Sequence, residues 1–217
     1  MEYKKKGLIG IIVGLEREKK LIPKNNNIIV KNAYGESSYH VAKKLIKQNV
    51  NFLISFGFAK SIKKNIKNSD VLIPKKIFNS KGKFLETSKK HNEFFKKKIH
   101  FNSILSNNIS TVNKIMNESE SVKGQNIGAV DMESFYVSKA ANENNVKFSC
   151  VRVIFDDNDT IIPKFLSESI DNEGKIKLFF LIYKVIVLPI RILELYRLSK
   201  QYTKSKKVIT QIAKSIF

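Results

Sequence analysis

Residues 149–159 read SCVRVIFDDND, a hydrophobic run that ends in a cluster of acids. Such a run predicts a buried β-strand with carboxylates at its carboxyl end, the edge where open α/β sheets bind ligands. A second pair of acids, Asp131 and Glu133, follows a short predicted strand at 127–130 and opens a predicted helix at 133–144. We expect the two strands to be neighbours joined by one crossover, with their acids at one edge of the sheet. The alternative is that these acids only cap a helix and form a solvated turn.

The remaining sequence alternates predicted strands with predicted helices. A helix is expected at 39–48, and a second, exposed helix within the lysine-rich stretch 80–98. Further hydrophobic runs of β type lie at 7–15, 28–30, 52–56, 71–73 and 103–106. This order predicts an α/β fold: a single domain with a mixed, mostly parallel central sheet flanked by helices, and a C-terminal helical extension. We place the α/β domain at 1–172 and the extension at 173–217.

Charge and cysteine content restrict the partners. The 217 residues carry a formal net charge of +21, almost wholly from lysines spread along the chain, with arginine only at positions 17, 152, 191 and 197. Because base recognition relies on arginine, no specific nucleic-acid partner is expected. Cys150 is the only cysteine and the three histidines show no ligand spacing, so we predict no metal site. The sequence opens without a recognisable secretory signal, which favours the cytoplasm.

The C-terminal region combines basic and apolar residues. From Arg197 to the end there is no acid, and apolar residues are interleaved with the basic ones: Leu198, Val208, Ile209, Ile212 and Phe217. This pattern indicates an amphipathic basic helix, of a kind that lies on anionic membranes. It therefore predicts either peripheral contact with the inner face of a membrane or packing against the domain or a second subunit.

Five segments, in this order, resemble the motifs of the purine nucleosidase and nucleoside phosphorylase superfamily. They are GIIVGLERE at 10–18, AYG at 33–35, LISFGFA at 53–59, VDMES at 130–134 and RVIFDDND at 152–159. With the tail around residues 188–198, they look closest to the hopanoid-associated branch, the adenosylhopane nucleosidase-like proteins. The resemblance implies an enzyme that cleaves the N-glycosidic bond of an adenosyl compound, such as an adenosyl lipid, and releases adenine. It also implies a homodimer and no cofactor.

The resemblance assigns roles to individual residues. Asp156 matches the general acid that protonates the purine, and Glu18 matches the acid that activates the attacking water. Glu133 matches the carboxylate that holds the ribose, and Met132 matches a residue packed against the sugar. The remaining substrate contacts are expected from Asp131, Gly57, Phe58, Ala59 and Phe155. Without the resemblance, Glu18 is better explained as a solvated acid in the charged turn expected at 16–20.

Two other functions stay open. The first is a purine nucleoside phosphorylase with inorganic phosphate as co-substrate; Glu18 disfavours it, because a carboxylate at the nucleophile position repels phosphate, although Arg17 could offset this repulsion. The second is a non-catalytic basic relative that binds a membrane or nucleic acid. Lys60 and Ser61 motivate this alternative, because they stand where the superfamily usually has glycines that let the backbone approach the ligand.

Overall fold

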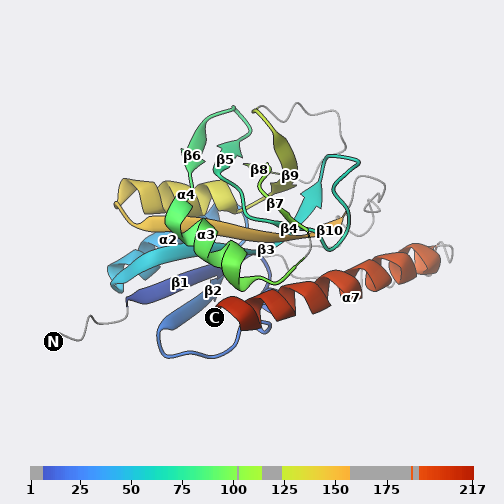
Figure 1. The fold of residues 1–217 in the computed structure, drawn as a ribbon, viewed down its shortest axis with the longest axis horizontal. Helices are drawn as coiled ribbons and strands as arrows, with labels where there is room; N and C mark the ends of the chain where they lie inside the picture. The colour runs from blue at the N-terminus through green and yellow to red at the C-terminus, as the bar shows by residue number, and fades with distance from the viewer. Residues whose placement is uncertain (1–6, 102, 114–123, 157–186, 188–190) are drawn as a thin grey trace.

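The computed structural model describes residues 7–101, 103–113, 124–156, 187 and 191–217, and it confirms the predicted fold class (Figure 1). The described residues form a ten-stranded sheet in the order β6-β5-β8-β9-β3-β10-β4-β7, while β1 pairs with β3 and β2 pairs with β1. The strands are β1 Leu8–Val13, β2 Ile28–Asn32, β3 Val50–Ser61, β4 Val71–Leu72, β5 Lys76–Asn79, β6 Phe84–Glu86, β7 Ile104–Leu105, β8 Asn108–Thr111, β9 Ile127–Asp131 and β10 Lys147–Asp156. The helices are α1 Glu16–Lys19, α2 Ser37–Lys47, α3 Lys89–Lys98, α4 Ser134–Glu143 and α7 Arg191–Ile216.

Strand β3 is the centre of the sheet. Its first part runs parallel to both β1 and β10, and its last residues pair antiparallel with β9, through Lys60 with Val130 and Ser61 with Ala129. The expectation that β9 and β10 are neighbours is therefore wrong, because β3 lies between them. The hydrophobic pattern located the end of each strand, but it carried no information on a third strand passing between the two ends.

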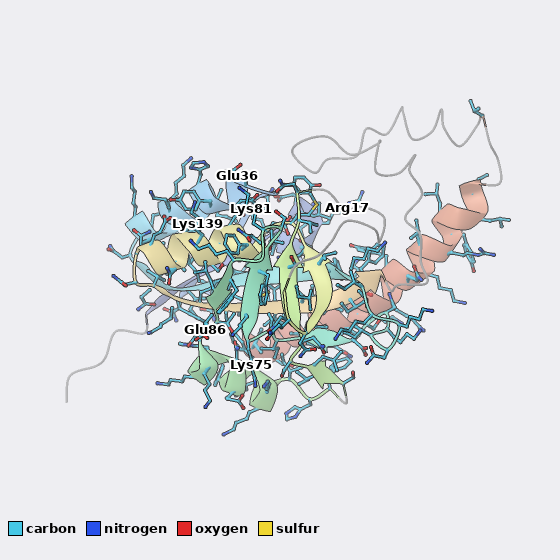
Figure 2. All side chains as sticks on the ribbon, turned by 90° about the horizontal axis from the view of Figure 1, so that it is seen from above. Arg17, Glu36, Lys75, Lys81, Glu86 and Lys139 are labelled. Atoms are coloured by element: carbon cyan, nitrogen blue, oxygen red, sulfur yellow. The ribbon has the colours of Figure 1, made fainter. Side chains whose placement is uncertain are left out.

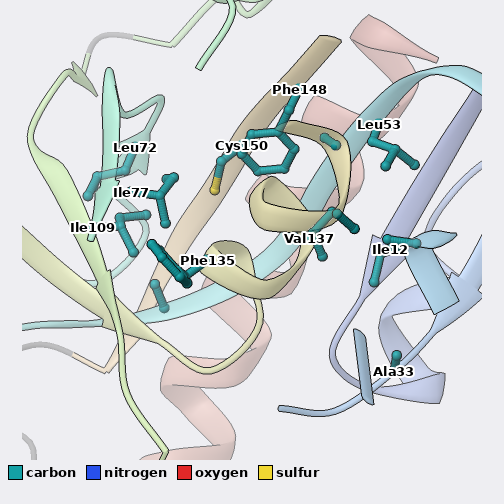
Figure 3. Packing of buried hydrophobic residues seen from close by; sticks show 14 of the residues in the cluster. Ile12, Ala33, Leu53, Leu72, Ile77, Ile109, Phe135, Val137, Phe148 and Cys150 are labelled. Atoms are coloured by element: carbon teal, nitrogen blue, oxygen red, sulfur yellow. The ribbon is translucent and has the colours of Figure 1, made fainter. Parts of the chain in front are cut away.

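Helices cover both faces of the sheet and divide the core in two. Alternate residues of β1 point to opposite faces, as strand geometry requires: Ile12 belongs to the core under α2 and α4, whereas Ile11 and Val13 belong to the core under α3 and α7. Figure 3 shows the first core, where Phe135 of α4 lies on the side of Ile77 and Ile109, and Val137 on the side of Leu53 and Ile12. Both faces of the central strands are thus withdrawn from water.

Some short elements were not predicted. The hairpin of β5 and β6 and the strand β8 have only three or four residues each, too few for hydrophobic alternation to be recognised. The stretch at 16–20, expected as a charged turn, is mostly the short helix α1. The boundary proposed at residues 172 and 173 lies outside the described residues.

The apolar face of helix α7 packs against the α/β domain. Leu198, Val208, Ile209 and Ile212 are buried, and the last three join the core under α3 and α7. Of the two alternatives for these residues, the structure thus shows packing on the domain. Within the described part of the chain, no helix combines the length and the hydropathy needed to cross a bilayer.

Candidate active site

Arg152 of β10 is the centre of a buried polar cluster. Its side chain is 1% exposed; Nε lies 2.9 Å from Asp131 Oδ2, and Nη2 donates to Ser55 Oγ at 2.8 Å. Nη2 also lies 2.7 Å from Asp131 Oδ2 and 3.4 Å from Glu133 Oε2. Burial lowers the pKa of the guanidinium, but the nearby carboxylates, Asp131 foremost, outweigh burial and raise it. Arg152 is therefore a fixed positive charge beside the predicted sugar-binding carboxylate.

Asp131 holds this arginine through a set of buried hydrogen bonds. Its Oδ1 accepts from Thr111 Oγ1 at 2.7 Å and from the Ser134 backbone N–H at 3.3 Å, and its Oδ2 accepts from Ser134 Oγ and Arg152 Nε. A carboxylate offers about four acceptor positions, and all four are occupied. These bonds anchor Arg152 and the first turn of α4, and the expected contact of Asp131 with the substrate stays a prediction.

Glu133 lies at the start of α4 and is 6% exposed. Burial raises the pKa of its carboxyl to about 8; Arg152 lowers it, Asp131 and Glu18 raise it, and a hydrogen bond from the Gly35 backbone lowers it. The end of β1 approaches closely, since a Cβ placed on Gly14 would lie 3.2 Å from Glu133 Oε1. The carboxyl therefore keeps its proton to a higher pH than a solvated glutamate does, and in its protonated form it can both donate and accept hydrogen bonds.

Glu18 points into the protein instead of into solvent. Its side chain accepts hydrogen bonds from the backbone N–H groups of Leu15 at 2.8 Å and Phe58 at 3.0 Å, and the residue is 4% exposed. Burial raises the pKa of this carboxyl, while the charge of Arg152 and the backbone donors lower it. The solvated-turn interpretation is therefore wrong for Glu18, because helix α1 turns this residue inward.

Gly57 allows Glu18 and Arg152 to approach each other. A Cβ on Gly57 would lie 2.6 Å from Arg152 Nη1 and 2.7 Å from Glu18 Oε1, closer than a carbon atom can be placed. Its φ of +153° is also a conformation that other residues rarely adopt. Gly57, predicted as a substrate contact, thus makes the space in which the acid from α1 meets the arginine from β10.

The AYG segment lies against the same cluster. The Tyr34 hydroxyl donates to Met132 Sδ at 3.1 Å, and Met132 is buried. The pKa of Tyr34 is raised by its partial burial and then by the charge of Glu133. The glycine turn after β2 therefore meets the VDMES segment in space, although the two are almost 100 residues apart in sequence.

Three aromatic rings meet where β3, β10 and α7 come together. The centroids of Phe58 and Phe155 are 6.0 Å apart, and Tyr202 of α7 lies 5.8 Å from the first and 6.2 Å from the second. The pKa of Tyr202 is raised by burial, lowered by Arg17 and raised by Glu18. The structure thus brings together two predicted residues and adds Tyr202, which the sequence gave no reason to select.

Asp156 is the last residue of β10. Its backbone pairs with Lys60 in β3, after a register irregularity that falls at Phe155, and the buried Ala59 pairs with Ile154. Lys60 also pairs with Val130 in β9, so Asp156 lies where the three central strands meet. The side chain of Asp156 lies outside the described part of the structure, and its catalytic role stays a prediction.

Outside the cluster around Arg152, the described residues include a cavity and scattered exposed charges. No group of three His, Cys, Asp or Glu side chains there is arranged to hold a metal ion. A cavity of about 690 Å³ near β5 and β6 has none of the predicted site residues in its lining. The charged residues labelled in Figure 2 are likewise scattered over several elements instead of gathering at one place.

Comparison with known proteins supports the fold and not a family assignment. No protein-family model and no curated protein sequence matches this chain. Among solved structures, the chain is similar to the 5′-methylthioadenosine/S-adenosylhomocysteine nucleosidase of Neisseria meningitidis in complex with methylthio-immucillin-A. The TM-score is 0.66, with 14% identity over 97% of this chain and 100% of that one.

Two Helicobacter pylori proteins are similar to the same degree. An aspartate-to-asparagine mutant of its MTAN, with 5′-methylthioadenosine in the active site, has a TM-score of 0.62 and 16% identity over 97% of this chain and 99% of that one. The native futalosine hydrolase has a TM-score of 0.60 and 19% identity over 70% and 88%. The predicted nucleosidase type of fold is therefore confirmed, while the hopanoid-associated branch stays a prediction.

Proposed function

We propose that this chain is a nucleosidase that hydrolyses the N-glycosidic bond of an adenosyl compound and releases adenine. The observation that carries the proposal is the burial of Glu18 and Glu133 around the guanidinium of Arg152, within a fold shared with nucleosidases. Two carboxyls with raised pKa values beside one fixed cation are typical of sites that move protons and stabilise a developing charge.

Each carboxyl has a distinct part in the reaction. Glu18 accepts a proton from water as the water oxygen bonds to the anomeric carbon. The bond from that carbon to the purine breaks, and Asp156 gives its proton to the purine, so that a neutral base departs. Glu133 holds the ribose hydroxyls; as positive charge develops on the sugar, its ionised form is stabilised, which offsets the cost of burying the charge.

Hydrolysis fits this cluster better than phosphorolysis. A phosphate dianion needs free cationic or N–H donors, but the guanidinium of Arg152 is already engaged by Asp131, Ser55 and Glu133. Arg17 is exposed and lies on the short helix α1, on the water side of Glu18. The acids at the nucleophile position would repel phosphate, whereas they assist a water molecule.

The finer features of the proposal concern the substrate and the assembly. We propose an adenosyl lipid of the adenosylhopane type, supported by the apolar surface of Phe58, Phe155 and Tyr202 next to the cluster. We also propose a homodimer located in the cytoplasm. The structurally similar Helicobacter pylori MTAN mutant holds 5′-methylthioadenosine in its active site, so that compound is the natural small test substrate.

The test is adenine release from a panel of adenosyl compounds, with and without inorganic phosphate. We expect release that is independent of phosphate, and a loss in kcat of about 10²- to 10⁴-fold in Asp156→Asn, the usual contribution of a general acid. Asp157→Asn is the matched control, since it removes the neighbouring acid of the same motif, and should stay within a few-fold of wild type. Absolute dependence on phosphate would show a phosphorylase, and no release from any compound would contradict the enzyme proposal.

A further inference from the structure

Helix α7 packs on the domain with its inner face and exposes its outer face. The inner face is fixed to the end of β10: Ser205 Oγ donates to the Ile154 carbonyl at 2.9 Å and accepts from Asn68 Nδ2 at 3.0 Å. Phe217, directly after the helix, packs edge-on against Phe56, with ring centroids 5.5 Å apart. The helix therefore has a fixed orientation on the domain, and its other face must remain outward.

The outer face is basic from Arg197 to Lys214. Spacings of three, four and seven residues place exposed cationic residues on one side of the helix: Arg197, Lys200, Lys204, Lys207 and Lys214. No described side chain on this outer face is acidic; the one acid in the helix sequence is Glu194. The helix rises about 26 Å between Arg197 and Lys214, so the basic residues form a straight stripe along this part of it.

The N-terminal part of the same face is apolar. Ile192 is 56% exposed, Leu193 57% and Tyr196 67%, although each belongs to a class of side chain that normally avoids water. This part of α7 extends away from the sheet in both views of the molecule (Figures 1 and 2). A helix that only faces solvent has no use for an exposed apolar end, so this end beside a basic stripe indicates an interaction surface.

We propose that the outer face of α7 docks the protein on anionic phospholipid bilayers. The basic residues would meet the lipid phosphates, while Ile192, Leu193 and Tyr196 enter the boundary between headgroups and acyl chains. Nucleic acid offers phosphates but no apolar layer for two aliphatic side chains. A second copy of this face would bring like charges together, and the docking is peripheral because α7 does not qualify as a membrane-spanning helix.

This surface differs from the one suggested by the sequence. There, Leu198, Val208, Ile209 and Ile212 formed the face expected to touch a membrane, but these side chains are buried in the protein. Docking through the opposite face leaves Tyr202, which faces the candidate site, undisturbed. The proposal therefore does not depend on the nucleosidase activity, and each can fail without the other.

The first experiment compares two triple variants that have the same net charge. Lys200→Gln/Lys204→Gln/Lys207→Gln removes charge from the outer face, and Lys31→Gln/Lys44→Gln/Lys47→Gln removes it from exposed positions of β2 and α2. With vesicles of phosphatidylcholine containing one third phosphatidylglycerol, the first variant should lose about 100-fold in partitioning and the second less than about threefold. Equal losses would overturn the proposal, because only the overall charge would then matter.

The second experiment locates the contact. The chain has no tryptophan, so Tyr196→Trp supplies a single fluorescent reporter, and Phe84→Trp on β6 is a matched control at another exposed ring. Anionic vesicles should shift the emission of the first reporter to shorter wavelength and leave the second unchanged, while pure phosphatidylcholine should shift neither. Duplex DNA that displaces the protein from vesicles, together with an unshifted Tyr196→Trp emission, would overturn the proposal in favour of nucleic-acid binding.

Discussion

The centre of the sheet and helix α7 place their charges in opposite environments. At the centre, one arginine meets Asp131, Glu133 and Glu18 out of contact with water, and each group depends on its neighbours. On α7 the cations lie in water, and they act together through a long-range field. Burial, and not the number of charges, should therefore decide how much a single substitution changes stability. Removing one of the few buried charges at the centre should cost more than removing one of the many exposed charges on α7.

The largest expected effect comes from removing the buried cation. Arg152→Met leaves Asp131 and Glu133 without their partner in a dry environment, and we expect a loss of about 3–5 kcal/mol in the free energy of unfolding. Arg197→Met removes an exposed arginine from α7 and should change stability by less than about 0.5 kcal/mol. Urea denaturation of both variants measures the difference directly.

A double variant tests the reason for this loss. If the cost comes from an unpaired carboxylate, Asp131→Asn in the Arg152→Met background should recover part of the stability, since the amide needs no countercharge. Equal stabilities for Arg152→Met and Arg197→Met would show that burial does not make the arginine at the centre more important for stability than the exposed one on α7.

Arg152 also shows how much of the site the sequence could reveal. An arginine within the hydrophobic run at 149–155 must be paired, and the acids at 131 and 133 were candidates beside those at 156–159, so part of the signal was present. The resemblance correctly brought Glu18 and Glu133 to one cluster. No pattern indicated that Thr111 and Ser55 complete it, because both are small polar residues whose roles depend on strand pairing.

The sequence predicted the elements that are long and hydrophobic. It predicted less well the order of the strands, which depends on how they pair. The runs at β1, β3 and β10 and the helices α2 and α4 were all expected. The insertion of β3 between β9 and β10 was not, because register and neighbours are set by the whole sheet. For the same reason, Tyr202 could not be selected: its place beside Phe58 follows from how α7 docks, not from its own sequence context.

Gly57 and Gly35 together separate the effect of backbone strain from the effect of close contact at the centre. Gly57→Ala introduces a Cβ where Arg152 Nη1 and Glu18 Oε1 lie less than 3 Å away, and Gly35→Ala introduces one with nothing within 4 Å. Both glycines have positive φ values, so both variants carry backbone strain of about 1–2 kcal/mol. We expect Gly57→Ala to cost at least about 1 kcal/mol more than Gly35→Ala and to abolish adenine release; equal costs would argue against a tightly packed cluster.

The pH dependence of stability should reveal the proton on Glu133. Its pKa in the folded protein, about 8, lies above the ordinary 4.5, so the folded state keeps a proton that the unfolded state has lost between these values. Stability should therefore fall as pH rises from about 4.5 to 8 and then level off. Glu133→Gln removes this contribution, so the wild type should lose stability relative to the variant over that range, by up to about 5 kcal/mol at about 1.4 kcal/mol for each unit of pKa shift. Denaturation curves at several pH values test this; parallel profiles would mean that Glu133 is ionised throughout.

The smallest expected effect lies where the two regions meet. Ser205→Ala removes the hydrogen bonds that join α7 to the Ile154 carbonyl and to Asn68, at a cost of about 1 kcal/mol. Thr203→Ala, on the exposed side of the same helix, is the control and should cost less. Amide hydrogen exchange then distinguishes a local from a global effect: if α7 is held to the domain mainly by this contact, exchange should accelerate in α7 and remain slow in β3. Faster exchange in both α7 and β3 would mean that the helix is an integral part of the core. The outer face of α7 could then not move independently of the candidate site.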